Sequence, residues 1–447
     1  MAFHLGIILS REQLIELEYS SDLHQHYQNL CDLPGFVLLE SGDYQRGRYD
    51  ILSAYPYERV VIHAHSMDSL EILDYLRDLV YMRPSSYDLP FQGGAIGYIS
   101  YDFGAELMGV KSTAQPLLTK MPLLNLGFYD WALITDHYLQ KVFLYAANQY
   151  PQTANQIQEV LALWKESFTA KQFKLTAEFK ALMTKEHYAY SFFEIQKALK
   201  QGRSYQVNFT QAFHAQYEGN TWAMYHQISK RNPVPFSAFL HLEDEDILSF
   251  SPERFLLHDE GKLLTSPIKG TIRRSDNPIE DKQLKLELAS SAKNRAENVM
   301  IVDLLRNDLG KIATTGSVLV NKLCELQSYN SVHHLVSDIE ARCRNDISLL
   351  DLFLYCFPGG SITGAPKLES MRIINELELY SRGLYCGSIV YFSRHGRFDS
   401  SIAIRSMIAK NNILHLAAGG GIVIDSNCED EYRECHIKIK AIINGLK

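Results

Sequence analysis

A lysine stands between a proline and a glycine near the middle of this 447-residue chain, in the stretch SPIKGT that spans Ser266–Thr271. Pro267 excludes the interior of a helix, and Gly270 favours a turn or a close approach of the backbone. Lys269 should therefore lie at a strand end or in a loop, where its amine could act as a nucleophile or bind an anion. A solvated loop lysine produces the same local pattern, so Lys269 alone leaves both interpretations open.

Two carboxylates one helical turn apart lie near the C-terminus. Ser426 stands three residues before Glu429, which is typical of the capping box that begins a helix. On that helix Glu431, Glu434 and Lys438 share one face. Such a carboxylate pair can bind a hard cation such as Mg²⁺. A solvated face with an ion pair between Glu434 and Lys438 is the commoner origin of this spacing.

A third acidic residue lies on a predicted helix over Ala289–Gly310. Glu297 shares a face with Ile301, and a carboxylate on an apolar stripe needs a cation or hydrogen bonds, because unpaired burial is costly. Glu297 could therefore join Glu431 or Glu434 around a metal ion. An internal ion pair with an arginine of the same helix is an equally good interpretation of its position.

Glycine-rich turns and one arginine offer groups that bind anions. Gly419–Gly421 end a predicted strand and expose backbone N–H groups, and Phe357–Lys367 is a second glycine-rich turn without the P-loop signature. The alternation in Ser401–Ala409 predicts one continuous strand with Arg405 on its small-residue face, which suits the binding of a carboxylate. A tight bulge and a surface arginine are the ordinary alternatives.

Two other titratable groups are ambiguous in isolation. Glu253 follows a predicted strand close to Lys269 in the sequence, and it could simply pair with Arg254. His333 and His334 precede a predicted helix, where one of them could be buried and functional. A histidine whose hydrogen bonds serve only the structure is the more common case.

The elements that must position these groups are strands and helices in alternating blocks. The polar stretch Thr169–Tyr188 is the best candidate for a boundary between them. This order predicts large, mostly antiparallel sheets covered by helices, an α+β fold. Strands are clearest at Gly35–Gly42, Arg59–Ser66, Gly94–Asp102 and Tyr129–Ala147, and helices at Leu70–Tyr81, Thr153–Phe168 and His187–Gly202.

Composition excludes several classes of protein. The chain is 46% apolar and 21% charged with a net charge of −8, so neither disorder nor a nucleic-acid or membrane surface is indicated. Its seven cysteines include no CxxC pair, which favours a reducing compartment. The N-terminus lacks the pattern of a signal peptide, and no apolar run reaches 18 residues. We therefore expect a soluble cytoplasmic protein.

Taken together, these segments resemble the chorismate-utilising enzymes. Nine ordered motifs carry the resemblance from about Tyr188 to the C-terminus, and together they are far more specific than any one alone. The N-terminal LLES, PFQGGAIGYISYDFG and YDWALITDH also look like the family. The nine are SYQVNFTQAF, FSPERFL, SPIKGTIRR, KNRAENVMIVDLLRNDLG, HHLVS, FPGGSITGAPK, LYCGSIVYFS, SIAIRSMI and AAGGGIVIDSNCEDEYRE.

The resemblance implies two large, mostly antiparallel sheets packed as a sandwich with outer helices and with the active site between them. It implies an N-terminal region of anthranilate synthase component I type over residues 1–168 and a chorismate-binding region over 185–447, interleaved in one compact unit. Anthranilate synthase large subunits carry alanine where Lys269 stands, whereas lysine is typical of the aminodeoxychorismate synthase component I branch. Anthranilate synthase, isochorismate synthase and a non-catalytic amidotransferase-binding partner are the rival functions.

By the same resemblance, chorismate would be aminated at C4 to 4-amino-4-deoxychorismate, in the branch that leads to para-aminobenzoate and folate. Lys269 would add at C2, Glu253 would protonate the leaving hydroxyl, and His334 would contact the ring. Magnesium would be held by Glu297, Glu431 and Glu434. The implied substrate-binding residues are Arg405, Tyr385, Thr363, Gly420, Gly421 and Lys438.

A partner and a second pocket are also implied. None of the cysteines lies in a G-x-C-x-G nucleophile turn, so ammonia would come from solution or from a separate glutamine amidotransferase subunit in a heterodimer. Glu40 and Ser41, with Pro235 and Phe236, resemble the family's tryptophan pocket. Whether tryptophan binds there is left open.

Overall fold

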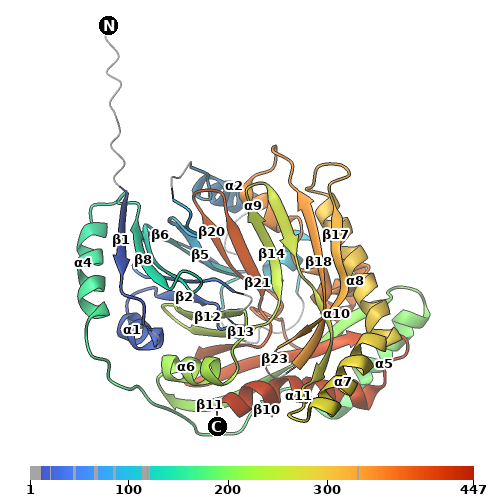
Figure 1. Cartoon of the computed structure of the whole chain (residues 1–447). Coiled ribbons are helices and arrows are strands. Elements are labelled where there is room, and N and C mark those ends of the chain that lie inside the picture. The colour runs from blue at the N-terminus through green and yellow to red at the C-terminus, as the bar shows by residue number, and fades with distance from the viewer. Residues whose placement is uncertain are drawn as a thin grey trace.

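The computed structural model describes residues 12–20, 22–43, 47–64, 69–83, 87–112, 118, 121–329 and 332–446 (Figure 1). Within these ranges the strands form two sheets in which all pairings are antiparallel, which confirms the predicted fold class. We call them the larger sheet, with 13 strands, and the smaller sheet, with 10. The last two residues of the strand predicted over Arg59–Ser66 lie outside the described residues.

The larger sheet runs in the spatial order β1 (Gln13–Leu17), β8 (Lys141–Ala146), β7 (Trp131–Asp136), β3 (Tyr49–Ser53), β2 (Val37–Glu40), β12 (Phe236–His241), β13 (Asp246–Ser251), β22 (Ser406–Lys410), β23 (Ile413–Ile422), β11 (Gln206–Gly219) and β10 (Lys180–Ala181), and β9 (Phe173–Leu175) and β19 (Gly364–Ala365) also pair with β11. The smaller sheet runs β16 (Ile268–Arg273), β18 (Val332–Arg342), β15 (Lys262–Thr265), β14 (Arg254–Asp259), β21 (Phe398–Ile402), β20 (Ser388–Ser393), β5 (Gly94–Ile99), β6 (Leu124–Tyr129) and β4 (Glu58–Ile62), with β17 (Leu319–Ser328) paired to β18.

The helices cover the outer faces of the two sheets. One apolar cluster joins the larger sheet to α1, α4, α5, α6 and α11, and a second joins the smaller sheet to α2, α3, α8, α9 and α10. A third cluster, which includes Tyr98, Leu240 and Ile389, packs the sheets against each other. The helices are α1 (Leu23–Leu30), α2 (Ser69–Leu79), α3 (Tyr101–Leu107), α4 (Thr153–Trp164), α5 (Lys185–Lys200), α6 (Thr221–Arg231), α7 (Pro278–Ser290), α8 (Ala292–Gly310), α9 (Leu349–Leu354), α10 (Lys367–Leu377) and α11 (Cys428–Leu446), with a 3₁₀ turn η1 (Gly360–Ile362).

Capping residues explain where the helices near the site begin. The Thr184 hydroxyl accepts a hydrogen bond from the His187 N–H at the start of α5, and Gly202 follows its end with a φ of +73°. Ser291 adopts an extended conformation between α7 and α8, and its hydroxyl caps α8 by accepting from the Asn294 N–H. The helix predicted over Ala289–Gly310 therefore begins at Ala292, because Ser291 interrupts it.

Two pairs of strands pass from one sheet into the other without losing their partners. In the first, β13 and β22 pair in the larger sheet and continue as β14 and β21, which pair in the smaller sheet. Backbone hydrogen bonds continue through the crossing, from the Ile402 N–H to the Glu253 carbonyl at 3.1 Å and from the Phe250 N–H to the Arg405 carbonyl at 3.2 Å. We call this pair the crossing ribbon. In the second, β3 and β7 continue as β4 and β6.

Two local predictions are wrong. The continuous strand predicted over Ser401–Ala409 breaks at residues 403–405, because the chain changes sheets there, and Arg405 takes a left-handed φ of +55°. His333 and His334 do not precede a helix but lie within strand β18, which is flanked by β16 and β17. Pairing with a strand on each side decides the conformation of this segment, which its sequence alone did not.

None of the helices within the described ranges is long and apolar enough to span a membrane.

Candidate active site

Lys269 lies on β16 and points its amine at the turn η1. Its Nζ donates a hydrogen bond to the Ser361 carbonyl at 3.1 Å, and the residue is partly buried. Burial lowers the pKa of the Lys269 amine, while the carboxylates of Glu253 and Glu297 act in the opposite direction. The surroundings therefore favour a neutral amine more than water does, which is the form that acts as a nucleophile.

Glu253 occupies the crossing ribbon, between β13 and β14, with only 5% of its surface exposed. Its Oε1 accepts a hydrogen bond from the Ser361 hydroxyl at 2.8 Å. Burial raises the pKa of this carboxyl, although the positive charge of Lys269 and the hydrogen bond from Ser361 oppose the shift. A carboxyl that keeps its proton at higher pH is suited to act as a general acid.

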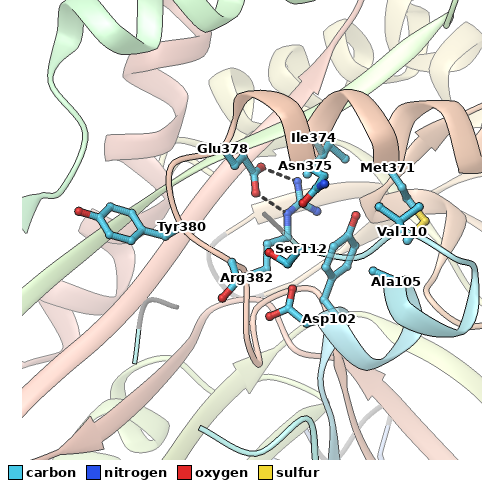
Figure 2. A pocket seen from close by; sticks show the side chains of 12 residues that line it. Asp102, Ala105, Val110, Ser112, Met371, Ile374, Asn375, Glu378, Tyr380 and Arg382 are labelled. Carbon is cyan, nitrogen blue, oxygen red and sulfur yellow. Dashed lines mark hydrogen bonds and ion pairs between the residues drawn. The ribbon is translucent and has the colours of Figure 1, made fainter. Parts of the chain in front are cut away.

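The turn η1 contacts both Lys269 and Glu253 through Ser361, and side chains from other elements act as a clamp that holds the turn in place. The carbonyl of Ile362 accepts hydrogen bonds from Asn208 Nδ2 and from Arg382 Nη1, both at 3.0 Å. Figure 2 shows the Arg382 guanidinium held by the Glu378 carboxylate, through contacts of 2.9 and 2.7 Å. Arg382 also lies over the Tyr101 ring at 4.6 Å. Sequence reasoning missed this clamp, because the sequence carries no sign that these side chains meet the 357–367 turn.

Two of the three predicted metal ligands converge at one glycine. A Cβ atom built on Gly420 would lie 3.0 Å from Glu431 Oε2 and 3.4 Å from Glu434 Oε1, so only glycine leaves that space open. Glu431 is buried and accepts from the Ser426 hydroxyl at 2.7 Å. Lys438 pairs with Glu434 at 2.6 Å and donates to the Gly419 carbonyl at 2.7 Å.

Glu297, the third predicted ligand, faces the same region from α8. Burial raises the pKa of its carboxyl, and the charge of Glu434 raises it further, against the influence of Lys269 and Lys293. Burial likewise raises the pKa of Glu431, with the charge of Glu434 adding to the effect. Among the described residues no three acidic, histidine or cysteine side chains are gathered closely enough to form a metal site as they stand. The charge of Glu434 nevertheless acts on both of the other carboxyls, and a divalent cation would relieve this repulsion.

Arg405 lies at the crossing ribbon beside Tyr385 and Glu434. No side-chain hydrogen bond or ion pair of Arg405 exists among the residues that the structure describes, although burial disfavours its charge and lowers its pKa. Tyr385 is buried with 9% of its surface exposed. A partly buried guanidinium that forms no ion pair is a suitable site for a substrate carboxylate.

The remaining predicted site residues differ in how free they are to bind. His334 Nδ1 lies 2.7 Å from the hydroxyl of Thr271, which stands two residues after Lys269 on β16. The imidazole therefore contacts the strand that carries the Lys269 amine. The Thr363 hydroxyl is fully buried and donates within its own turn to the Gly359 carbonyl at 3.1 Å. Gly421 packs against the Gln206 side chain, whose Nε2 would lie 2.7 Å from an added Cβ atom.

The four residues of the predicted tryptophan pocket line one cavity of about 410 Å³ between the sheets. Glu40 accepts hydrogen bonds from His24 at 2.6 Å and from the Tyr225 hydroxyl at 2.5 Å, so it is tied into the cavity wall. Ser41 lies beside it, and Pro235 and Phe236 line the same space. The cavity is separate from the groups around Lys269, and its ligand stays a prediction.

Comparison with known proteins points to the same family that the sequence motifs resemble. A family model described as chorismate binding enzyme matches residues 35–444. Aminodeoxychorismate synthase component 1 of Escherichia coli K12 is 42% identical over 454 residues, which cover 97% of this chain and 98% of the relative. The protein of the same name from Salmonella typhimurium LT2 is 40% identical over 451 residues, with the same coverage. The crystal structure of anthranilate synthase component I from Streptococcus pneumoniae TIGR4 has a TM-score of 0.81 and 29% identity, covering 89% of this chain and 92% of that chain.

Proposed function

Because the chain belongs to the family of chorismate binding enzymes, we propose that it aminates chorismate at C4, as an aminodeoxychorismate synthase component I. The observation that carries the proposal is the pairing of Lys269 and Glu253 through one turn, with an amine biased towards its neutral form and a carboxyl biased towards its protonated form. This pair supplies a nucleophile and a general acid at one place.

In the proposed reaction the Lys269 amine forms a bond to ring C2 while the C4–oxygen bond breaks. Glu253 gives its proton to the leaving oxygen, which departs as water. Ammonia then forms a bond to C4, the bond between C2 and Lys269 breaks, and the lysine is regenerated. The net change is chorismate plus ammonia to 4-amino-4-deoxychorismate plus water, and the transient lysine adduct directs the amine to C4 instead of C2.

Substrate binding falls to the cations and backbone groups that face this pair. Arg405, which forms no ion pair among the described residues although Glu434 lies near it, would take one carboxylate of the substrate, and Tyr385 lies beside it. Lys438 and the backbone of Gly420 and Gly421 would hold the other polar groups of the substrate, while His334 would contact the ring. Thr363 would act through the shape of its turn, because its hydroxyl is already engaged.

Magnesium is the cofactor that the acidic residues fit. Glu297, Glu431 and Glu434 would hold it, and the repulsion that the Glu434 charge exerts on the other two carboxyls is the feature of this chain that favours a divalent cation. When bound, the ion supplies Lewis-acid polarisation and orientation of the ring carboxylate. Gly420 keeps the space beside two of these ligands open.

The ammonia would come from a glutamine amidotransferase partner or from solution. The relatives are named component 1, which implies a second component, and no cysteine of this chain lies in a glutaminase nucleophile turn. The proposal therefore predicts activity with ammonium salts alone and a further activity with glutamine when the partner is present.

The test is product analysis with the purified chain, chorismate, Mg²⁺ and ammonium, followed by the Lys269→Ala variant. We expect 4-amino-4-deoxychorismate from the wild type, and at least a hundredfold lower rate from the variant with unchanged chorismate binding. Lys262→Ala is the matched control, because this lysine lies exposed on β15, which β18 separates from β16 in the smaller sheet, and it should keep full activity. Formation of ortho-aminobenzoate or isochorismate, or a variant with full rate, would contradict the proposal.

A further inference from the structure

The two groups proposed to react with chorismate both contact one residue, Ser361. Its hydroxyl donates to Glu253 Oε1 at 2.8 Å, and its carbonyl accepts from Lys269 Nζ at 3.1 Å. Ser361 is 4% exposed, so no bulk water competes for either bond. The general acid and the nucleophile come from different elements, the crossing ribbon and β16, and Ser361 belongs to neither of them.

We propose that Ser361 is a positioning residue for the amination, which holds the carboxyl of Glu253 with its side chain and the amine of Lys269 with its backbone. This inference rests on the proposed function and adds to it a residue that touches neither substrate nor metal. The spacing between proton donor and nucleophile is then set by the length of one residue.

The backbone of Ser361 is itself immobilised. The Thr363 hydroxyl donates to the carbonyls of Gly359 and Gly360 at 3.1 and 3.3 Å, which closes the turn on one side of Ser361. On the other side, Asn208 and Arg382 hold the Ile362 carbonyl. Because these bonds fix the backbone on both sides of Ser361, this residue determines the positions of the Glu253 carboxyl and the Lys269 amine.

The hydroxyl of Ser361 also stabilises the ionised form of Glu253. The charged and titratable groups that face Glu253 are Lys269 and Lys438, which favour the carboxylate, and the Cys386 thiol. The backbone N–H of Ile268 adds to the same effect. Because the Ser361 hydrogen bond acts with these groups, its removal should raise the pKa of Glu253.

The experiment measures kcat, KM and the pH dependence of kcat for Ser361→Ala with chorismate and ammonium. We expect kcat to fall about tenfold, since the hydrogen bond that positions the Glu253 carboxyl is lost, and KM for chorismate to stay unchanged. The limb of the profile that reports Glu253 should move to higher pH. Ser53→Ala is the matched control. Ser53 is also buried, and its hydroxyl donates to the Trp131 carbonyl, which belongs to neither the crossing ribbon nor β16.

A second pair of variants separates the hydroxyl from the packing of the site. Ser361→Thr and Ser361→Val have the same shape, and only the threonine keeps the donor. We expect the threonine variant to retain the wild-type pH profile and the valine variant to show the shifted profile, even if the alanine variant folds poorly.

The outcomes are distinguishable from a failure of the proposed function. A wild-type enzyme that makes ortho-aminobenzoate or isochorismate contradicts the proposed function. Threonine and valine variants with equal kcat and superimposable pH profiles contradict the role of Ser361, whatever the product. A KM that rises in parallel with the loss of kcat would also overturn that role, because it would place Ser361 in substrate binding.

Discussion

At the scale of single residues, burial shifts the pKa values of the two groups proposed to react away from their values in water. Burial raises the pKa of Glu253 and lowers that of Lys269, so each is drawn towards its neutral form. The charge of each group also favours the charged form of the other, since both groups contact Ser361 and lie close together. Both shifts favour the forms that the proposed general acid and the proposed nucleophile require.

Gly420 should matter through the space that it leaves. In Gly420→Ala the new methyl group would meet the carboxylates of Glu431 and Glu434 at 3.0 and 3.4 Å, and Glu431 is buried and cannot easily withdraw. We expect Mg²⁺ to bind about tenfold more weakly, as measured by isothermal titration calorimetry.

Gly310→Ala is the control for that variant, because Gly310 ends α8 and nothing lies within 4 Å of an added Cβ atom. An unchanged Mg²⁺ affinity in Gly420→Ala would show that these two carboxylates do not hold the ion.

The buried pair of His24 and Glu40 should make stability depend on pH. Burial opposes the charge on His24, but Glu40 at 2.6 Å outweighs it and raises the pKa of the imidazole. A raised folded-state pKa gives stability that is present below pH 6.5 and is lost as pH rises through the folded value. We expect His24→Ala to lower the free energy of unfolding by about 3 kcal/mol at pH 6.

The loss in His24→Ala should shrink clearly at pH 9, where the wild type has itself lost the charge on His24. Urea unfolding at both pH values measures the difference, and His187→Ala on α5 serves as the control. An equal loss at the two pH values would mean that His24 stabilises the fold by packing alone.

What sequence could and could not predict is clear for these residues. Lys269, Glu253 and the three acidic residues could be named because each stands in a motif whose order matches a family. Ser361 and Arg382 could not, because their roles depend on contacts with Glu253, more than 100 positions away, and with Asn208, 174 positions away. Motifs mark candidates for the reacting residues, whereas the contacts that would hold those candidates in place become visible only once the chain is folded.

At the scale of elements, the position of Glu297, a proposed metal ligand, depends on how helix α8 begins. Helix α8 carries Glu297, and its first turn depends on the Ser291 cap. We expect Ser291→Ala to cost about 1 kcal/mol and to speed amide hydrogen exchange in the first turn of α8.

Ser290→Ala is a closely matched control for the cap. Ser290 is the adjacent residue, is exposed, and bonds only the carbonyls of its own helix, those of Leu286 and Glu287. Equal exchange rates in the two variants would show that the start of α8 is fixed by packing instead of by its cap.

Strands and helices with strong local patterns were predicted well, and the exceptions share one cause. Helices α4 and α5 begin within two residues of the predicted positions, because apolar periodicity and capping residues are local signals. The break at Arg405 and the strand at His334 depend on partners far away in the chain. Short alternating segments therefore reveal that a strand forms but not where it changes sheets.

At the scale of the whole molecule, the two sheets draw strands from both halves of the chain. In the larger sheet β2 pairs with β12, and in the smaller sheet β5 pairs with β20. Neither half therefore closes a sheet without the other, and we expect residues 185–447 alone not to fold.

The intact protein should unfold in one cooperative transition. Urea curves from far-UV circular dichroism and from the fluorescence of Trp131, Trp164 and Trp222 should coincide, since these side chains are all buried in the same cluster. Two separated transitions would show instead that the chain contains independent folding units.

The crossing ribbon has a consequence for how this enzyme tolerates motion. Glu253 and Arg405 are both held within the crossing ribbon by main-chain hydrogen bonds, to Ile402 and Phe250, whereas Glu297 lies on α8 and Glu431 and Glu434 lie on α11. Motion of α8 and α11 when Mg²⁺ or substrate binds would change the distances among the three acidic residues. It would leave the distance between Glu253 and Arg405 unchanged. The proposed general acid and the proposed carboxylate-binding arginine are thus fixed by the sheets, whereas the proposed metal ligands lie on helices that can move relative to them.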